Sequence, residues 1–550
     1  MDSTPLLVQS DRSLLLEVHH PAFEDARADI APFAELEKSP EHIHTYRMSP
    51  LSLWNAASAG LTADSILAVL DARSRYPVPE NVRFFVRDTL GRWGLFQLDA
   101  GPDADTLSLR VPDERLRREV GNQRRLAGFL TPADGGFTLP LLHRGTLKRD
   151  MLELGYPVQD LAPLREGAPL KVALRPTTLS GSALTIRDYQ KSAADGVLGR
   201  GQPGMGFGTV VMPCGSGKTV VGLEVLSRLA TNTLVLTTNV AAVHQWIDEL
   251  LDKTTLSADE IGEYTGERKV IRPVTVATYQ VLVWRENKEG GYPHFRLFRE
   301  RDWGLIVYDE VHLLPAPVFR VTAELQAVRR VGLTATLVRE DGAEGDVFSL
   351  VGPKRYDVPW KELEAKGWIA EALCTEIRLE LPENLRIPYA VAAKREKFRV
   401  ASENPAKDDV VAQLVANHPD DAILVIGQYI GQLETLAKTL KAPLITGSTP
   451  NAERERLYED FRQGRIRVVV VSKVANFAIN LPDASMAIQV SGTFGSRQEE
   501  AQRLGRILRP KKRNALFYTL VSRATSEEEY SAHRQKFLVE QGYKYTIEVW

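Results

Sequence analysis

The sequence predicts an α/β protein with two parallel-sheet lobes in tandem, preceded by a smaller α+β region. From about residue 208, a short apolar segment, a turn and a helix with 3.6-residue periodicity follow one another repeatedly. The same rhythm begins again after Trp360, whereas residues before about 175 lack it. Because alternating strands and helices are typical of parallel sheets, we expect one such sheet on each side of Trp360.

This rhythm places the individual strands and divides the chain. The first lobe should contain strands at Thr209–Met212, Thr233–Thr237, Val274–Thr278, Leu305–Tyr308 and Val331–Thr334. The second should contain strands at Ala422–Gly427, Leu444–Thr446, Ile466–Ser472, Met486–Ser491 and Leu516–Val521. Helical segments are expected around Leu51–Leu70 and Asp113–Leu130, and a short helical insertion or linker at 382–405. We therefore expect domains at 1–105, 106–175, 176–360 and 361–550.

The composition is that of a soluble globular protein. Apolar residues make up 43% and charged residues 25%, with 69 Lys and Arg against 71 Asp and Glu. A binding path for an acidic polymer must therefore be local, and the densest basic stretch is RLGRILRPKKR at 503–513. The apolar runs are far shorter than the roughly 20 residues of a membrane span, and the first residues lack the features of a secretion signal. We expect a monomeric, cytoplasmic protein without a membrane partner.

The segment PCGSGKT at 213–219 has the composition of a phosphate-binding loop. It follows the apolar strand TVVM and runs directly into the helical stretch VVGLEVLSRLA. Its glycines let the backbone wrap around phosphate groups, which the amides of a helix N-terminus attract. Lys218 can reach the β and γ phosphates of ATP, and the Thr219 hydroxyl can ligate Mg²⁺. We assign nucleotide binding to Pro213, Cys214, Gly215, Ser216, Gly217, Lys218 and Thr219. An ordinary glycine-rich turn is the alternative, and Met212 stands where the strict pattern has glycine.

A pair of acidic residues, Asp309 and Glu310, ends the strand GLIVYDEVH, and His312 follows two residues later. The carboxyl ends of parallel strands meet at one edge of the sheet, where the phosphate-binding loop also opens. We expect Asp309 to hold Mg²⁺ and Glu310 to orient and deprotonate the attacking water. His312 is expected to couple this site to the other lobe. Thr334 and Thr336, in GLTATLVRED, are expected to relay hydrogen-bond changes, with ordinary core threonines as the alternative.

The second lobe carries a basic helix in SRQEEAQRLGRILRP. Spacings of three and four residues place Gln502, Arg503, Arg506 and Arg509 largely on one face. Arginines that reach a nucleotide held by another lobe stabilise charge in the transition state, so Arg506 and Arg509 are candidate arginine fingers. Salt bridges to Glu499 and Glu500 on an exposed helix are the alternative. In the segment IRDYQ, upstream of the phosphate-binding loop, Arg187 and Gln190 are candidate adenine contacts.

The motifs PCGSGKT, DEVH, TAT and QRLGRILR, in this order and spacing, resemble those of superfamily 2 helicases. More narrowly, GLTATLVRED, SKVANFAINLPDAS and QEEAQRLGRILRPKK are similar to the XPB family of DNA repair and transcription helicases. The resemblance extends upstream, because HIHTYRMSPLSLWNAASAGL is similar to that family's N-terminal domain. LELGYP and LRPTT lie where that family has its damage-recognition region. The resemblance therefore covers most of the chain.

This resemblance implies two RecA-like lobes, ATP and Mg²⁺ as cofactors, and 3′ to 5′ movement on duplex, forked or damaged DNA in DNA repair, including nucleotide excision repair. It implies that Arg339, Glu340 and Asp341 form the family's RED element, and that segment 382–405 is a short thumb. A nuclease or another repair protein is the implied partner, and a prokaryotic source is expected.

Two positions depart from the family pattern: Asn480 replaces an acidic residue, and Ala475 replaces a glycine. Two other activities stay open: a duplex translocase that does not separate strands, which the motifs do not exclude, and an ATP-switched scaffold that binds damaged DNA, which Asn480 allows. An RNA helicase is disfavoured, because that class carries DEAD and SAT in place of DEVH and TAT.

Overall fold

The computed structural model divides the chain into two compact units. One unit comprises Met1–Val211 and Gly217–Asp357, and the other comprises Met212–Ser216 and Val358–Trp550. The residues described are 4–38, 42–103, 105–199, 204–213, 215–287, 292–314, 318, 322, 325, 328–335, 344–358, 363–364, 366–368, 372–472, 484–492, 515–540 and 545–550.

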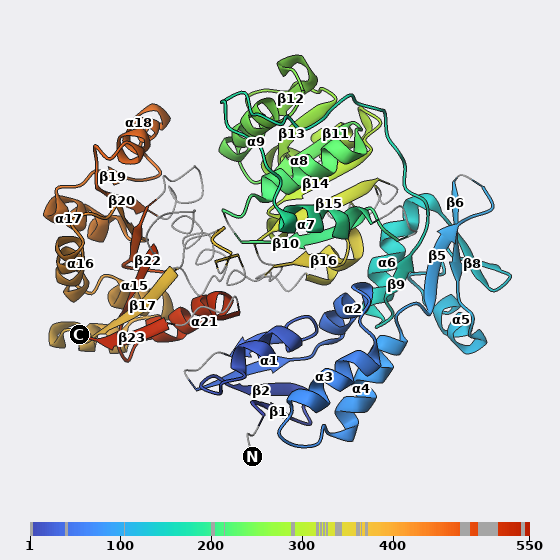
Figure 1. Cartoon of the computed structure of the whole chain (residues 1–550), viewed down its shortest axis with the longest axis horizontal. Coiled ribbons are helices and arrows are strands. Elements are labelled where there is room, and N and C mark those ends of the chain that lie inside the picture. The colour runs from blue at the N-terminus through green and yellow to red at the C-terminus, as the bar shows by residue number, and fades with distance from the viewer. Residues whose placement is uncertain are drawn as a thin grey trace. The chain divides into compact units, whose positions relative to one another are not determined.

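The first unit begins with a four-stranded antiparallel sheet of order β1-β2-β4-β3, drawn in blue in Figure 1. Its strands are β1 Leu6–Val8, β2 Ser13–Glu17, β3 Glu35–Lys38 and β4 Ile43–Arg47, and its helices are α1 Phe23–Ile30, α2 Pro50–Ser58, α3 Ala63–Arg73 and α4 Glu80–Gly91. The one helical segment expected around Leu51–Leu70 is two helices. The reason is that Gly60 turns the chain at φ 95° and Thr62 then caps α3 by accepting a hydrogen bond from the Ser65 amide.

In the described part of the chain, no single helix is long and apolar enough to cross a membrane. Helices α2 and α3 meet that test only as a pair bent by 114°.

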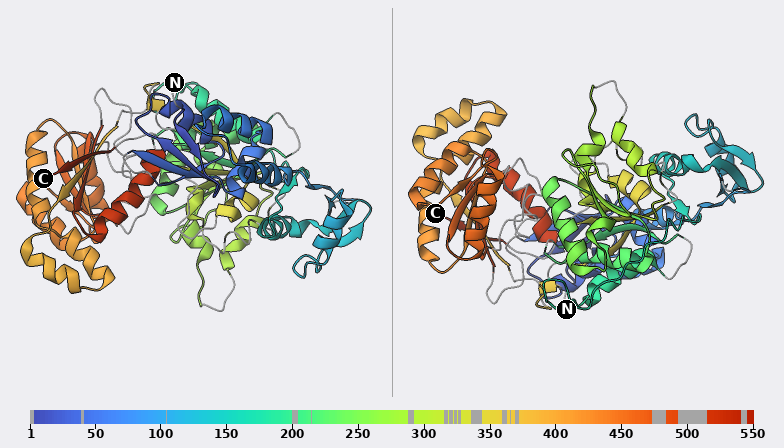
Figure 2. Two further views of the ribbon diagram at one scale, coloured as in Figure 1. Left: turned by 90° about the horizontal axis from the view of Figure 1, so that it is seen from below. Right: turned by 90° about the horizontal axis from the view of Figure 1, so that it is seen from above.

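A five-stranded sheet of order β7-β8-β6-β5-β9 follows, drawn in cyan in Figures 1 and 2. Its strands are β5 Phe96–Ala100, β6 Thr106–Arg110, β7 Thr131–Ala133, β8 Gly136–Pro140 and β9 Val158–Asp160, with helices α5 Glu114–Gly121, η1 Leu141–His143 and α6 Arg144–Glu153. The expected boundary at residue 105 falls between β5 and β6, which are paired strands of this one sheet. The helix expected at Asp113–Leu130 ends at Gly121, and turns fill most of the rest.

The first lobe contains a seven-stranded parallel sheet of order β12-β13-β11-β14-β15-β10-β16. Its strands are β10 Phe207–Val211, β11 Thr233–Thr237, β12 Ile261–Tyr264, β13 Val274–Thr278, β14 Leu305–Asp309, β15 Arg329–Thr334 and β16 Lys354–Asp357. Its helical segments are α7 Asp188–Leu198, α8 Lys218–Leu229, α9 Val240–Lys253, η2 Ala258–Glu260, α10 Tyr279–Val283, η3 Pro293–Arg299, η4 Val311–Leu313, α12 Glu344–Asp346 and η5 Val347–Val351. Helices α7, α8 and α9 pack side by side along this sheet (Figure 1). All five expected strands of this lobe are present, and β12 and β16 are additional.

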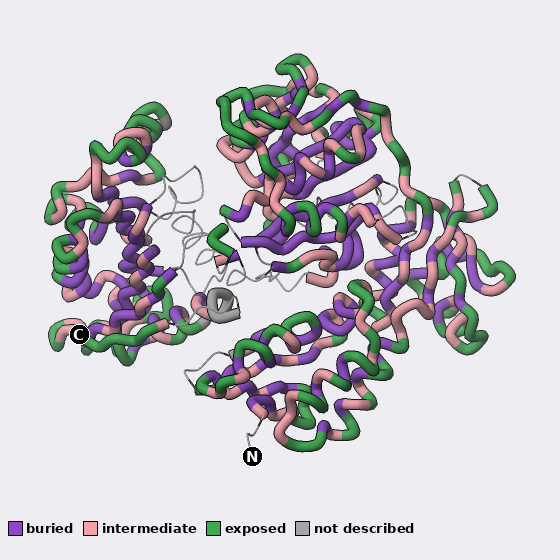
Figure 3. The backbone as a smooth tube through the Cα atoms, viewed as in Figure 1, coloured by how far each residue is buried: buried purple, intermediate pink, exposed green. Residues whose placement is uncertain are grey.

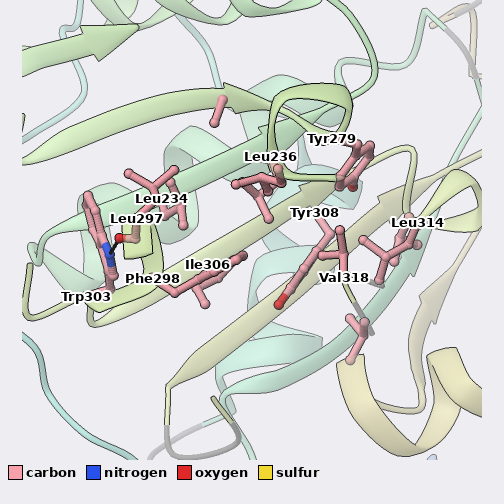
Figure 4. Packing of buried hydrophobic residues seen from close by; sticks show 14 of the residues in the cluster. Leu234, Leu236, Tyr279, Leu297, Phe298, Trp303, Ile306, Tyr308, Leu314 and Val318 are labelled. Carbon is pink, nitrogen blue, oxygen red and sulfur yellow. Dashed lines mark hydrogen bonds between the residues drawn. The ribbon is translucent and has the colours of Figure 1, made fainter. Parts of the chain in front are cut away.

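The central strands of this sheet are largely apolar and buried on both faces, as the purple segments of Figure 3 show. The edge strand β16, KRYD, is polar and partly exposed. Successive residues of a strand point to opposite faces. Leu234, Leu236, Ile306 and Tyr308 accordingly share one core with Trp303, whose indole donates a hydrogen bond of 2.9 Å to the Leu297 carbonyl (Figure 4). This packing fixes the carboxyl ends of β11 and β14, which carry the residues of the site described below.

The second unit contains another seven-stranded parallel sheet, of order β19-β20-β18-β21-β22-β17-β23. Its strands are β17 Ala372–Leu379, β18 Ile423–Gly427, β19 Leu444–Ile445, β20 Val468–Ser472, β21 Met486–Gln489, β22 Ala515–Ser522 and β23 Tyr545–Val549. Its helices are α14 Glu383–Val391, α15 Lys394–Ser402, α16 Ala406–Asn417, α17 Ile430–Leu440, α18 Asn451–Arg462 and α21 Ser526–Glu540. The five expected strands are present, and the segment expected to be helical at 382–405 contains α14 and α15. Strands β17 and β23 are additional.

Candidate nucleotide site

The loop between β10 and α8 has the backbone shape that its glycines predict. The amide and the hydroxyl of Ser216 both donate to the Pro213 carbonyl, at 3.3 and 2.6 Å. Gly217 caps α8 in the left-handed region, at φ 84°. This φ favours glycine, and the side-chain nitrogen of Gln190 lies 2.5 Å from where a Cβ atom would be. Gly217 therefore leaves the N-terminus of α8 without a Cβ atom at its cap.

Lys218 and Glu310 face each other across this site. The Lys218 ammonium lies 3.7 Å from Oε1 of Glu310, and both side chains are mostly buried. Lys218 is the first residue of α8, whereas Glu310 directly follows β14 in the left-handed region at φ 49°. That conformation is unusual for a residue other than glycine, and such residues tend to cluster at functional sites.

His312 links Glu310 to the neighbouring strand. Its Nδ1 lies 3.4 Å from Oε2 of Glu310 and 2.7 Å from the hydroxyl of Thr334, the last residue of β15. Both His312 and Thr334 are buried. A movement of the Glu310 side chain can therefore be transmitted to the end of β15 through one side chain, that of His312.

Asp309 is held by three residues that the sequence did not single out. Its Oδ2 accepts hydrogen bonds from the Trp246 indole at 2.9 Å and from the Thr237 hydroxyl at 3.3 Å. The Tyr279 hydroxyl donates to the main-chain carbonyl of Asp309 at 2.9 Å. Thr237 ends β11, and Tyr279 directly follows β13. A search of the sequence for polar residues at the carboxyl ends of strands could therefore have found both.

Burial and the neighbouring Glu310 carboxylate raise the pKa of Asp309 to about 6, although Trp246, Lys218 and Thr237 act in the opposite direction. Two adjacent carboxylates in a partly desolvated site repel each other, and a divalent cation between them would relieve that repulsion. The donor set therefore fits Mg²⁺, a cation that prefers oxygen ligands. Thr219, in the first turn of α8, is the neighbouring hydroxyl candidate.

Comparison with known proteins matches every part of this chain. The family model described as ERCC3/RAD25/XPB C-terminal helicase matches residues 363–549. Models described as type III restriction enzyme, res subunit, and as helicase conserved C-terminal domain match residues 183–339 and 6–133. Over its full length, the chain is 52% identical to a protein of Kineococcus radiotolerans named DNA 3'-5' helicase XPB, of which the match covers 97%. The chain belongs to the XPB family of helicases.

Two further relatives agree with this assignment. The protein of the same name from Mycobacterium tuberculosis is 50% identical, with 100% of this chain and 98% of the relative covered. The Saccharomyces cerevisiae general transcription and DNA repair factor IIH helicase/translocase subunit XPB/SSL2 is 31% identical, with 99% and 72% covered. The predicted family is confirmed, and with it two RecA-like lobes and an ATP-hydrolysing helicase of superfamily 2.

In this XPB-family chain, the structure brings together Lys218, Glu310, His312 and Thr334, and it places Asp309 beside Glu310. It also places Gln190 against Gly217, while the side-chain Oε1 of Gln190 accepts from the Arg187 amide at 3.0 Å. Several residues named from the sequence lie outside the described residues, and their roles stay predictions: Cys214, Thr336, Arg339, Glu340, Asp341, Ala475, Asn480, Gln502, Arg503, Arg506 and Arg509.

Trp246→Phe is expected to slow ATP hydrolysis about tenfold. The substitution removes the indole donor to Asp309, together with part of the buried ring that packs against Gly222. A lost hydrogen bond to a charged group is worth about 1.5–3 kcal/mol. Turnover measured against Mg²⁺ concentration checks this, with Trp284→Phe as the control, because Trp284 is 52% exposed in the same lobe. Equal turnover in the two variants would show that the indole does not position Asp309.

Proposed function

We propose that this chain uses ATP to move 3′ to 5′ along DNA and to separate its strands in DNA repair. The observation that carries the proposal is the position of Glu310, whose two oxygens lie near Lys218 on one side and His312 on the other. One carboxylate therefore contacts both the phosphate-binding helix and the residue bonded to β15. Full-length similarity to proteins named as DNA 3'-5' helicases supports the direction of movement and the substrate.

We assign ATP to the loop 213–219, with Gln190 and Arg187 toward the adenine. Lys218 would bind the β and γ phosphates, and Thr219 and Asp309 would hold Mg²⁺. Bound there, the metal would neutralise charge that develops on the phosphates during transfer.

Glu310 is positioned to orient and deprotonate the attacking water. Phosphoryl transfer depends mainly on an in-line nucleophile and on charge stabilisation, so a single carboxylate of this kind is sufficient protein chemistry. The proton that Glu310 accepts would weaken its attraction to Lys218 and alter its contact with His312. Because His312 is also hydrogen-bonded to Thr334, the change would be transmitted to the end of β15. Arg506 and Arg509 of the second lobe are proposed to complete the charge stabilisation.

Duplex, forked or damaged DNA is the proposed substrate, and a nuclease or another repair protein is the proposed partner in the cytoplasm. The chain has nearly balanced charge, with 69 basic and 71 acidic residues, so DNA contacts must be local. Phosphate contacts should dominate them, and affinity should therefore fall steeply with salt and depend little on sequence.

The direct test uses duplexes with a single-stranded tail at either the 3′ or the 5′ end. We expect ATP-dependent displacement from the 3′-tailed duplex and at least about tenfold less from the 5′-tailed one. Lys218→Ala, which lacks the phosphate-binding ammonium, should be inactive on both substrates.

A triplex-displacement assay distinguishes the alternative activities. Loss of the third strand while the duplex stays paired would favour a duplex translocase. Tight, nucleotide-dependent DNA binding without displacement in either assay would favour an ATP-switched scaffold. Each result would contradict the proposed unwinding.

A further inference from the structure

A cavity of about 250 Å³ lies in the first unit, apart from the nucleotide site. Its walls come from the end of α2, from α6, from β9, from the start of β10, from η5 and from β16. The cavity thus adjoins both N-terminal sheets and the parallel sheet of the first lobe. Of the residues that the structure describes, three charged ones line it, namely Lys148, Asp160 and Arg355.

Among the described residues of this wall, the one carboxylate, Asp160, is already shared. Asp160 accepts two hydrogen bonds from the Arg144 guanidinium, at 2.8 and 3.0 Å, and one from the Lys148 ammonium at 2.9 Å. All three side chains are almost completely buried. Burial alone would raise the pKa of Asp160, but the two cations hold it well below its usual range. The one negative charge of Asp160 is therefore shared between the two buried positive charges of Arg144 and Lys148.

Arg355 adds a third cation without adding a carboxylate. Its guanidinium donates to the carbonyls of Ser58, Gly204 and Phe207, at 3.0, 2.6 and 3.4 Å. Within the described part of the chain, no carboxylate forms an ion pair with it. Burial lowers the pKa of Arg355 to about 10. These carbonyl bonds use three of its five N–H donors and do not neutralise its charge.

Three cations lie close to the ring of Phe207, at the start of β10. The Lys148 ammonium lies 5.3 Å from the ring centroid, and the guanidinium carbons of Arg330 and Arg355 lie at 5.1 and 5.8 Å. Burial, together with Arg330 and Arg144, lowers the pKa of Lys148 to about 7, despite its bond to Asp160. Buried charges in proteins are normally paired, and among the described residues Lys148 and Arg355 line this open space with one carboxylate, Asp160, which Arg144 also binds.

We propose that this cavity binds a small free oxyanion of the phosphate class between Lys148 and Arg355. The space is several times the roughly 30 Å³ that one water occupies in the liquid, so a tetrahedral oxyanion and a few waters fit. An arginine fork and an ammonium are the groups that recognise such anions. Since β10 leads from Phe207 into the phosphate-binding loop, the anion would also join α6 and β9 to the strand that carries the nucleotide site.

The test is a titration of inorganic phosphate into the full chain carrying Lys218→Ala, with chloride holding the ionic strength constant. This background removes the ammonium that would bind phosphate at the nucleotide site. Calorimetry should give saturable binding, which a further Lys148→Met substitution weakens at least about tenfold. Arg149→Met is the matched control, because Arg149 is the next residue on α6, is 37% exposed and pairs with Asp150. It should leave the affinity unchanged.

Hydrogen exchange keeps the test informative if Lys148→Met does not fold. In the Lys218→Ala protein, phosphate should slow exchange in α6 and β10. Unchanged exchange, absence of saturable binding, or equal affinity with Lys148→Met would overturn the proposal and assign the cavity to water. Displacement of bound phosphate by a short DNA oligonucleotide would overturn the assignment to a free anion, since the DNA backbone would then be the ligand.

Discussion

Glu310→Gln is expected to reduce ATP hydrolysis at least about a hundredfold, in both the presence and the absence of DNA. The amide keeps the size of the carboxylate but cannot accept a proton, and a positioned general base contributes about 10²–10⁴-fold to a rate. ATP binding should persist, because Lys218 and the loop glycines are unchanged. Steady-state turnover and nucleotide affinity, measured on the same protein, separate these two effects.

Glu300→Gln provides the control for this variant. Glu300 is an exposed carboxylate in the same lobe that lies 3.7 Å from the exposed Arg296, and its loss should not change turnover. If Glu310→Gln hydrolysed ATP at the original rate, the water would have to be activated by another group, and the role of Glu310 would reduce to its contacts with Lys218 and His312.

Most of the strands that the sequence predicts correctly are buried on both faces. Their continuous apolar runs, such as 468–471 in β20, need no knowledge of their neighbours. Strand β17 was missed because Glu376 and Arg378 interrupt its apolar pattern. In the fold, Glu376 is 2% exposed and accepts a hydrogen bond of 2.7 Å from Ser531 of α21. That donor lies 155 residues away, so no local pattern could predict the burial of this carboxylate.

In the nucleotide site, too, local sequence patterns identify some residues, whereas others depend on contacts between distant parts of the chain. Lys218, Asp309, Glu310 and His312 could be named because their motifs have fixed spacing and follow a recognisable strand. Trp246 could not be named, because it reaches Asp309 from the second turn of α9, 63 residues earlier. The contact depends on how α9 packs, since the Trp246 ring also lies where a Cβ atom on Gly222 of α8 would clash. Positioning residues of this kind require the packed structure.

Lys407→Met is expected to destabilise the second lobe by about 3–5 kcal/mol. Lys407 donates to both oxygens of Glu527 at 2.8 Å, and neither side chain is more than 1% exposed. Glu527 also accepts a hydrogen bond of 2.9 Å from the Ser522 amide at the end of β22. Removing one partner of a buried pair leaves an uncompensated charge, which costs far more than the net contribution of the pair itself.

A double variant tests whether the stranded charge of Glu527 causes this destabilisation. Combining Lys407→Met with Glu527→Gln removes the stranded charge, while the amide oxygen can still accept from Ser522. The double variant should therefore be more stable than Lys407→Met alone. Lys438→Met, on the exposed part of α17, should change stability by less than about 0.5 kcal/mol. Amide hydrogen exchange of β22 in the full chain measures this lobe separately from the other unit. A double variant less stable than Lys407→Met would mean that the lost lysine contacts, rather than the stranded carboxylate, account for the destabilisation.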